Sequence, residues 1–454
     1  MAFKQTIKKF IPTRLLRSIR PLYHGLKGQF WALRYGYPAR KLEVIGITGT
    51  KGKTTTTAFT GRLLNLYGKK AGYISTSVIC TGKDEFLNPH KMTTIDSRHM
   101  QHYISQMVQN GCQYLVIEMS SQGLEQHRHW GLKGFDTGVF LNIYPEHIEA
   151  HGSFEKYIAA KSIMFKNMRK YGAFVGNKDF HESTVMEQAI KAEALKDVHR
   201  TMISVKNEIS ITSNKKTLYK ELSWNGKRYE TNFTADFDIH NAYFGAWAIA
   251  VTLARTEQKQ QEIIRELLLL LPSLSTVPGR MEFVVRGGED VFSGSGPITE
   301  KHISILVDYA HEPASMELLL TTLKEWRSGG HFKEIIHVLS CDGAGRDDWK
   351  KPIMGALSHR YADTTIYTTD NFSASDSPEE IIRLLTKDVT GDYISNISRE
   401  EAMKEALRKA LGNNKKVLIV STGVGSEQGL TQPKGTMDWD ERRKWVEVAN
   451  RMSF

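Results

Sequence analysis

The chain has 454 residues, of which 40% are hydrophobic and 24% are charged. This composition is ordinary for a globular protein, and the length is enough for roughly three units of about 150 residues each. No uninterrupted apolar run of about 18 residues occurs, so the sequence predicts no membrane-spanning helix. The cysteines form no C-x-x-C pair, which argues against a zinc knuckle or a disulfide framework and favours a reducing, cytoplasmic setting. They are Cys80, Cys112 and Cys341.

The net charge of +11 is concentrated in residues 1–42, which hold basic but no acidic side chains. The basic residues are Lys4, Lys8, Lys9, Arg14, Arg17, Arg20, Lys27, Arg34, Arg40 and Lys41. Pro12, Pro21 and Pro38 predict that this arm is cut into short helical pieces. Two interpretations remain open: contact with an anionic membrane or anionic substrate, and packing of the arm on the protein core.

From residue 43 the pattern alternates between short apolar runs and helical patterns. The run LEVIGI at 42–47 predicts a buried strand, TGTKGK a turn, and the following residues up to Gly68 a helix. Later apolar runs at 114–119, 137–143 and 173–177 predict further strands of a parallel sheet covered by helices.

A second alternating set follows PGRMEFV. Strands are predicted at 303–310, 335–341, 364–370 and 415–423, with helical patterns between them. The sequence therefore predicts an α/β protein with a basic helical arm (1–42), a first parallel-sheet domain (43–278) and a Rossmann-like α/β domain (279–454).

The stretch GITGTKGKTTTT at 46–57 resembles a phosphate-binding loop in which Ile47 stands where the common pattern has its first glycine. Gly49 and Gly52 let the backbone approach phosphate oxygens, and the amides of the following helix N-terminus face the anion. Lys53 would then pair with the outer phosphates and Thr54 with magnesium. The alternative is an ordinary glycine-rich turn before a helix.

Glu118 ends an apolar strand, where nucleotide-binding enzymes often carry a metal-holding carboxylate; otherwise it is an exposed strand-end residue. A helix that begins after Ser153 would place Lys161 on the same face as Phe154, Ile158 and Phe165. A buried ammonium needs an anionic partner or a modification, unless the side chain reaches the surface. His147 and His151 precede this helix and are candidates for metal ligands or for hydrogen-bonded structural histidines.

These motifs together resemble the Mur ligase family. The resemblance runs through TGTKGKTT, MTTID, EMSSQGLEQHR, NIYPEHIEAHGSFEKYIAAK, GNKD, FDIHNA, PGRMEFV, VDYAHEP, CDGAGRDDWKKPIMG and TTDN, and it is strongest to the branch that adds the third residue of the stem peptide. It implies an ATP-dependent amide-bond ligase with an acyl-phosphate mechanism, acting on a muramyl-peptide precursor of peptidoglycan. The implied cofactors are ATP, two Mg²⁺ ions and an N6-carboxylysine at Lys161. The implied partners are ATP, an amino acid and the precursor, without nucleic acid.

The resemblance also assigns individual residues. The implied nucleotide contacts are Thr48, Gly49, Thr50, Lys51, Gly52, Lys53, Thr54, Thr55, Asn241, Arg280 and Asp308. The implied magnesium ligands are Thr54, Glu118, His147 and carbamylated Lys161. The implied substrate contacts are Thr93, Thr94, Ser121, Arg128, Arg346, Asp370, Asn371 and Glu427. The implied catalytic residues are Lys53, Lys161, His147, Asp308 and His311.

Three features depart from the family pattern. Only the basic arm precedes the first sheet, where the third-residue branch carries a domain of about a hundred residues that binds uridine diphosphate. The motif D-N-P-R reads Asp370, Asn371, Phe372, Ser373, and the late G-K-G-H-E motif reads GVGSE at 423–427. Two alternatives therefore stay open: a ligase for another carboxylate, folylpolyglutamate-like or lipid-linked, and a nucleotide-binding interaction module without ligase activity.

Overall fold

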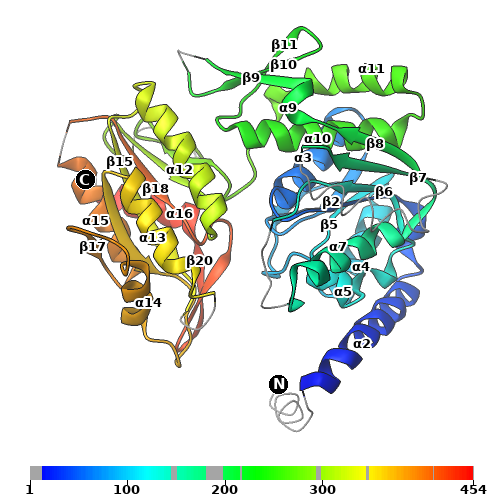
Figure 1. Cartoon of the computed structure of the whole chain (residues 1–454), viewed down its shortest axis with the longest axis horizontal. Coiled ribbons are helices and arrows are strands. Elements are labelled where there is room, and N and C mark those ends of the chain that lie inside the picture. Colours follow the sequence, from blue (N-terminus) through cyan, green and yellow to red (C-terminus); the bar gives the residue numbers. More distant parts are fainter. Residues whose placement is uncertain are drawn as a thin grey trace. The chain divides into compact units, whose positions relative to one another are not determined.

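The computed structural model describes residues 13–144, 151–179, 198–214, 217–292, 298–343, 347–412 and 414–452, with the side chains of 13–18 left aside. The chain divides into two compact units (Figure 1). Unit 1 comprises Met1–Thr212 and Lys220–Ser275, and unit 2 comprises Ser213–Tyr219 and Thr276–Phe454.

Unit 1 is built on an eight-stranded sheet in the order β4-β3-β2-β5-β1-β6-β7-β8. Strands β2, β5, β1, β6, β7 and β8 lie side by side and pair in parallel. Strands β3 and β4 add an antiparallel edge beside β2. Central parallel strands are covered on both faces, which explains their continuous apolar runs. The strands are β1 Glu43–Thr48, β2 Ala71–Ile74, β3 Val78–Cys80, β4 Glu85–Leu87, β5 Tyr114–Glu118, β6 Phe135–Phe140, β7 Met168–Asn177 and β8 His199–Ile203.

Helices cover this sheet, and a three-stranded sheet in the order β11-β10-β9 accompanies it. The helices of unit 1 beyond the first are η1 Pro38–Lys41, α3 Lys53–Leu66, α4 Ser97–Gln109, α5 Ser121–Glu125, η2 Arg128–Gly131, α7 Phe154–Lys166, α9 Val205–Glu208, α10 Asp236–Leu253, α11 Glu257–Leu268 and η3 Leu271–Ser273. The small sheet consists of β9 Ile209–Ser213, β10 Lys220–Trp224 and β11 Lys227–Glu230.

Within the basic arm, Thr13–Arg34 form one continuous helix, α2, which packs on η2 and α4. The prediction that prolines cut it into short pieces is therefore wrong at Pro21, which lies inside the helix. A proline in a helix removes one backbone hydrogen bond and usually bends the axis. Contacts made by the following turns hold α2 to unit 1, including the ion pair of Lys27 with Asp96 at 2.6 Å.

Unit 2 is built on a seven-stranded sheet in the order β13-β12-β14-β18-β15-β16-β17. The strands from β14 to β17 in this order are parallel, and β12 and β13 form an antiparallel edge. The strands are β12 Glu282–Arg286, β13 Glu289–Asp290, β14 Ile303–Val307, β15 Glu334–Cys341, β16 Thr364–Thr369, β17 Ile394–Ser395 and β18 Val417–Ser421. A hairpin of β19 (Gln428–Gln432) and β20 (Gly435–Asp440) follows.

Five helices complete the described part of unit 2: α12 Pro313–Ser328, α13 Lys350–Tyr361, α14 Pro378–Leu385, α15 Arg399–Leu411 and α16 Glu441–Met452. The predicted α/β fold with a parallel-sheet first domain and an α/β C-terminal domain is confirmed. Within the described part of the chain, every helix is too short or too polar to span a membrane.

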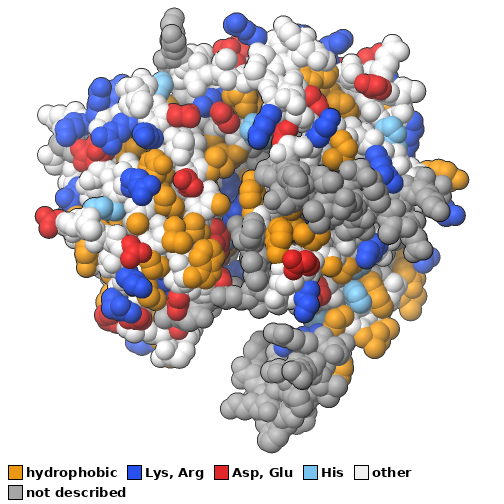
Figure 2. All heavy atoms as spheres, in the orientation of Figure 1, with side chains coloured by type: hydrophobic (Ala, Val, Ile, Leu, Met, Phe, Trp, Pro, Cys, Tyr) orange, Lys and Arg blue, Asp and Glu red, His pale blue; other side chains and the backbone are white. Residues whose placement is uncertain are grey.

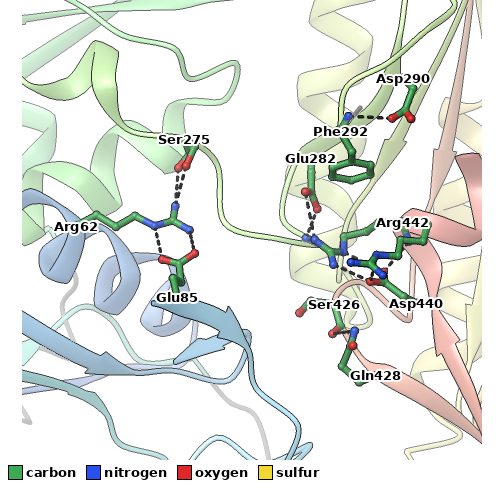
Figure 3. A network of polar contacts seen from close by, with 12 residues as sticks. Arg62, Glu85, Ser275, Glu282, Asp290, Phe292, Ser426, Gln428, Asp440 and Arg442 are labelled. Carbon is green, nitrogen blue, oxygen red and sulfur yellow. Dashed lines mark hydrogen bonds and ion pairs between the residues drawn. The ribbon is translucent and has the colours of Figure 1, made fainter. Parts of the chain in front are cut away.

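In each unit, an arginine side chain links elements that are far apart in the sequence (Figure 3). In unit 1, Arg62 on α3 binds Glu85 through two nitrogens, at 2.6 and 2.8 Å, and donates to the carbonyl of Ser275 at 2.8 Å. In unit 2, Arg442 on α16 pairs with Asp440 at 2.7 Å and reaches Glu282 at 3.5 Å. Such forked contacts hold guanidinium and carboxylate in one geometry and so position the elements that carry them.

Candidate active site

The predicted phosphate loop joins β1 to α3 in unit 1. Residues Thr48 to Thr55 run from the end of the strand through the first turn of the helix. Gly52 at the helix N-cap has φ of 81°, and the N-cap has no side-chain hydrogen bond. A Cβ on Gly52 would lie 2.4 Å from Oδ1 of Asn241 on α10, so only glycine fits beside that side chain. The helix N-terminus therefore follows a glycine-containing turn, the arrangement that suits a phosphate.

Asn142, which follows β6, fixes the shape of the loop. Its Oδ1 accepts from the N–H groups of Thr50 at 3.0 Å and Lys51 at 2.8 Å, and its Nδ2 donates to the Lys51 carbonyl at 3.1 Å. The Thr50 hydroxyl lies 3.0 Å from the Tyr157 hydroxyl. Lys53 Nζ donates to the Thr50 carbonyl at 2.9 Å, so its ammonium lies against the loop. Sequence reasoning missed Asn142, although it directly follows the apolar run of β6.

Glu118 is buried at the carboxyl end of β5, beside β1, and is 1% exposed. The Thr54 hydroxyl lies 3.1 Å from both carboxylate oxygens. Thr76 donates to Oε2 through its N–H at 2.7 Å and its hydroxyl at 2.9 Å, and that hydroxyl lies 3.0 Å from the Thr93 hydroxyl. The structure thus brings Thr54, Glu118 and Thr93 together through Thr76, which the sequence did not single out. The exposed alternative for Glu118 is wrong.

Lys161 lies on α7, which begins after Ser153 as predicted, with the Ser153 hydroxyl accepting from the third residue of the helix. The side chain is 1% exposed, so the alternative in which it reaches the surface is wrong. Its Nζ donates to the Gly49 carbonyl at 2.7 Å and lies 4.5 Å from the centre of the Tyr157 ring. The lysine therefore ends at the phosphate loop, underneath its first glycine.

The residues predicted on the substrate side form a second group in unit 1. The Thr94 hydroxyl lies 3.0 Å from the Ser120 hydroxyl, and Arg128 donates to the Thr94 carbonyl at 2.8 Å. Ser121 contacts His151 Nε2 at 3.0 Å. Burial lowers the pKa of His151, and the charge of Lys161 lowers it further, while Glu125 opposes this.

The other ring nitrogen of His151, Nδ1, lies 3.3 Å from a Glu125 carboxylate oxygen but makes no hydrogen bond within the part of the chain that the structure describes, so Ser121 is the hydrogen-bond partner of this ring there. Among the described residues, no three His, Cys, Asp or Glu side chains lie close enough to hold a metal ion together. Two predicted site residues, His147 and Arg346, lie outside the described residues. Asn241, predicted near the nucleotide, accepts from the Thr56 hydroxyl at 3.2 Å and so lies at the first turn of α3.

A small pocket in unit 2 gathers several of the remaining predicted residues. It is lined by Tyr309, His311, Cys341, Asp342, Lys350, Asp370, Gly423 and Glu427. Glu427 accepts from the Tyr309 hydroxyl at 2.9 Å and from Asn371 Nδ2 at 3.1 Å. His311, predicted as a catalytic residue, and Asp370, predicted as a substrate contact, also line it. Sequence reasoning missed the contributions of Tyr309 and Lys350, of which Lys350 pairs with Glu312 at 2.9 Å.

Asp308 and Arg280 support this pocket from behind Tyr309. Asp308 is buried and accepts from the N–H groups of Met281 at 2.8 Å and Ala310 at 2.7 Å. Burial raises the pKa of Asp308, and the Arg280 charge opposes the rise. The Arg280 guanidinium stacks on the Tyr309 ring at 4.2 Å. In this arrangement Asp308 positions the backbone, and the guanidinium orients the tyrosine.

Asp370 lies at the bottom of the pocket, where its Oδ2 accepts from the Ser340 hydroxyl at 2.9 Å. Burial raises the pKa of Asp370 to about 8, and the nearby charge of Asp342 adds to the rise. Burial likewise raises the pKa of Cys341, which makes this thiol a poor nucleophile. The raised pKa favours the protonated form of Asp370 at neutral pH.

Two family models match the chain, one within each unit. The Mur ligase middle domain matches residues 47–250, and the Mur ligase glutamate ligase domain matches residues 279–423. A UDP-N-acetylmuramoyl-L-alanyl-D-glutamate–2,6-diaminopimelate ligase of Clostridium acetobutylicum is 31% identical over 421 residues, which cover 90% of this chain and 78% of that protein. The corresponding ligase of Bacillus cereus is 29% identical over 417 residues, with coverage of 90% and 78%.

Solved structures share the fold at lower identity. A UDP-N-acetylmuramoyl-L-alanyl-D-glutamate–2,6-diaminopimelate ligase matches with a TM-score of 0.58 at 22% identity, over 94% of this chain and 83% of that one. A Mycobacterium tuberculosis folylpolyglutamate synthase matches with a TM-score of 0.65 at 15% identity, over 91% and 95%. The family matches in both units, with the relative at 31% identity, confirm the resemblance: the chain belongs to the Mur ligase family of ATP-dependent carbon–nitrogen ligases.

Proposed function

We propose that this ligase adds an amino acid to a muramyl-peptide precursor of peptidoglycan. The observation that carries the proposal is the buried contact of Glu118 with Thr54 at 3.1 Å. This contact lies beside the phosphate loop, at the end of which Lys53 begins α3. Relatives at about 30% identity are named for ligation to such a precursor, and this supports the same substrate class. The alternative of an interaction module without ligase activity has no comparable support, because Gly49, Lys53 and Thr54 of the loop are all in place.

The proposed reaction has two steps. An oxygen of the substrate carboxylate attacks the terminal phosphorus of ATP, which forms an acyl phosphate and releases ADP. The amino group then attacks the acyl carbon, so that the C–N bond forms, phosphate leaves and the amine loses a proton. The amides at the start of α3 and the Lys53 ammonium would bind the phosphate groups and offset the negative charge that gathers as two anions meet.

The residues around Glu118 fit a magnesium ion. A carboxylate and the Thr54 hydroxyl are hard oxygen donors, and Mg²⁺ in nucleotide sites is typically held by one or two such groups together with phosphates and water. Bound there, Mg²⁺ would neutralise charge on the phosphate oxygens. Thr76, with two hydrogen bonds to Oε2, would keep the carboxylate directed toward Thr54. His147 remains a proposed further ligand.

We also propose that Lys161 carries a carbamate. A neutral lysine amine attacks CO₂, which forms an N–C bond, releases a proton and converts a potential cation into an anion. Burial favours the neutral amine from which this reaction starts, and Lys161 is 1% exposed. Its Nζ reaches the Gly49 carbonyl of the phosphate loop. A carboxylate at that position would add a further oxygen donor for Mg²⁺ beside the loop.

The residues that would recognise the added amino acid depart from the family pattern. Ser373 stands where the family has arginine, and its N–H and hydroxyl donate to Asp376 at 2.7 and 2.8 Å. Serine cannot form the bidentate contact that arginine makes with a carboxylate. Diaminopimelate is therefore not implied for this chain, although its relatives are named for it.

A second candidate is a ligase for another carboxylate acceptor. Its acceptor would be folylpolyglutamate-like or lipid-linked, and a folylpolyglutamate synthase shares the fold over 95% of its own chain. Contact of residues 1–42 with an anionic membrane is a separate proposal, which depends on α2 and not on the ligase site.

The experiment is a panel of amino acids assayed with UDP-linked muramyl peptide, lipid-linked muramyl peptide and a folate. Phosphate release and product mass are measured together, and Lys53→Met serves as the inactive control. We expect phosphate release that requires both an amino acid and a muramyl peptide. Requirement for the folate would favour the second candidate, and ATP turnover that no amino acid changes would contradict both ligase proposals.

A further inference from the structure

Helix α2 exposes its large apolar side chains instead of burying them. Residues 19 to 33 carry six of them on one face, and each is between 50% and 62% exposed. They are Ile19, Leu22, Tyr23, Leu26, Phe30 and Leu33. Their spacing of three and four residues places them on one stripe of the helix, about 100° wide. Figure 2 shows hydrophobic side chains gathered along α2.

The fully buried positions of α2 lie on the opposite face, which packs on the rest of unit 1, and they are small residues. A Cβ on Gly25 would lie 2.5 Å from the Trp130 ring, and one on Gly28 would lie 3.2 Å from the Gly131 nitrogen. Ala32, one turn further along this face, is fully buried. The helix is thus held with these six bulky side chains away from the core, while large apolar groups usually pack inside. The apolar stripe is therefore not part of the core of unit 1.

A row of cations runs beside the stripe. Arg20, Lys27 and Arg34 recur at seven-residue intervals and so lie on one side of the helix. Lys27 pairs with Asp96, while Arg20 and Arg34 are exposed. The whole segment 1–42 has ten basic and no acidic side chains. An apolar stripe bordered by cations is the arrangement by which a helix lies in the surface of a bilayer that contains anionic lipid.

We propose that α2 docks this enzyme on an anionic lipid surface, with the stripe inserted at the boundary of headgroups and acyl chains. Association of two copies through the same stripe would bring two cationic rows together, which like-charge repulsion opposes. An anionic bilayer supplies both an apolar medium for the stripe and negative charge for the row. The orientation of α2 on unit 1 leaves both features accessible at once.

The test is flotation of the full-length chain with vesicles of phosphatidylcholine alone or mixed with phosphatidylglycerol. We expect recovery with the mixed vesicles only. Leu26→Ser with Phe30→Ser should lower the partition coefficient at least about tenfold, because two exposed apolar anchors are lost. Arg20→Gln with Arg34→Gln should lower it by about tenfold as well, and added salt should do the same to the wild type.

The matched control is Leu318→Ser with Ile353→Ser, two exposed apolar residues of unit 2 that should leave flotation unchanged. Since all the substituted residues are exposed, melting temperatures and ATP turnover in solution should not change. Equal recovery from both kinds of vesicle, absence of recovery, or unchanged flotation of the Leu26→Ser, Phe30→Ser variant would overturn the proposal. Light scattering that shows a dimer lost in that variant would instead assign the stripe to a second copy of the chain.

Discussion

Replacement of Lys161 by alanine gives the sharpest test of the proposed carbamate. The side chain is 1% exposed and reaches the Gly49 carbonyl at 2.7 Å. The change removes three buried methylenes, at about 0.8 kcal/mol each, and a hydrogen bond of about 1 kcal/mol. Removal of the amine offsets part of this loss, because burial of that polar group costs free energy in the wild type. We therefore expect the free energy of unfolding to fall by no more than about 3 kcal/mol, so that the variant stays folded.

Activity should fall much further than stability. Loss of an anion that holds a metal at the phosphate loop should lower kcat by about 10³-fold, equivalent to roughly 4 kcal/mol of transition-state stabilisation. The truncation leaves space where the lysine side chain lay, so acetate or formate should restore part of the activity. Lys166→Ala is the matched control, because Lys166 lies exposed on the same helix and should leave the rate unchanged.

A direct measurement accompanies the kinetics. The wild type and Lys166→Ala should show a carbamate signal in ¹³C NMR after incubation with labelled bicarbonate, and Lys161→Ala should not. Full activity of Lys161→Ala would refute the role of the side chain. Loss of activity without rescue by small carboxylates, together with a wild type that shows no carbamate signal, would leave Lys161 as a cation at the loop and refute the modification.

Three further changes test other parts of the molecule. Glu118→Gln should keep the fold but raise the Mg²⁺ concentration needed for half-maximal activity and lower kcat/KM by about 10²-fold to 10³-fold; an unchanged Mg²⁺ requirement would contradict its role. Because burial and Asp342 raise the pKa of Asp370 to about 8, the folded state keeps a proton that the unfolded chain releases above about pH 4, and stability should fall as pH rises through this window. Asp370→Asn should therefore gain melting temperature relative to the wild type between about pH 5 and about pH 8, and a constant difference would be evidence against the raised pKa. Gly25→Ala should lower the free energy of local opening of α2 by about 1–3 kcal/mol, because the new Cβ meets the Trp130 ring at 2.5 Å. Hydrogen exchange of the α2 amides measures this change, and unchanged exchange would show that the contact is not tight.

Local signals in the sequence were sufficient for the loop and its neighbours. Strand, glycine-rich turn and helix follow one another from β1 to α3 within a short stretch, so their order alone places Lys53 and Thr54. Helical periodicity after Ser153 placed Lys161 on the apolar face of its helix, and the end of an apolar run placed Glu118. In each case the prediction depends on the period of a helix or strand, which neighbouring residues determine.

The partners of these residues were not predictable in the same way. Asn142 and Thr76 reach the loop and Glu118 because parallel pairing brings the carboxyl ends of β6, β2 and β5 to the same edge of the sheet as that of β1. The sequence predicts the strands but not their order across the sheet. The continuity of α2 through Pro21 was also missed, because propensity rules describe an isolated segment, whereas packing on η2 and α4 stabilises this one.

The chain agrees with the family pattern where ATP would bind and departs from it where the amino acid would bind. Every ATP-dependent ligase must bind the same phosphate groups, so a loop of glycine, lysine and threonine beside a buried carboxylate meets a fixed requirement, and here it is intact. The amino acid differs between ligases, and the residues that would contact it are the ones that change: Ser373 replaces the family arginine and donates to Asp376. The pocket of unit 2 holds a buried Asp370 whose raised pKa favours the protonated form, and Glu427, which accepts a hydrogen bond from Tyr309. We propose that this pocket selects the amino acid through these carboxyl groups and Lys350 and not through the guanidinium clamp of the family. Exchange of pocket residues should then change which amino acid is used before it changes the use of ATP.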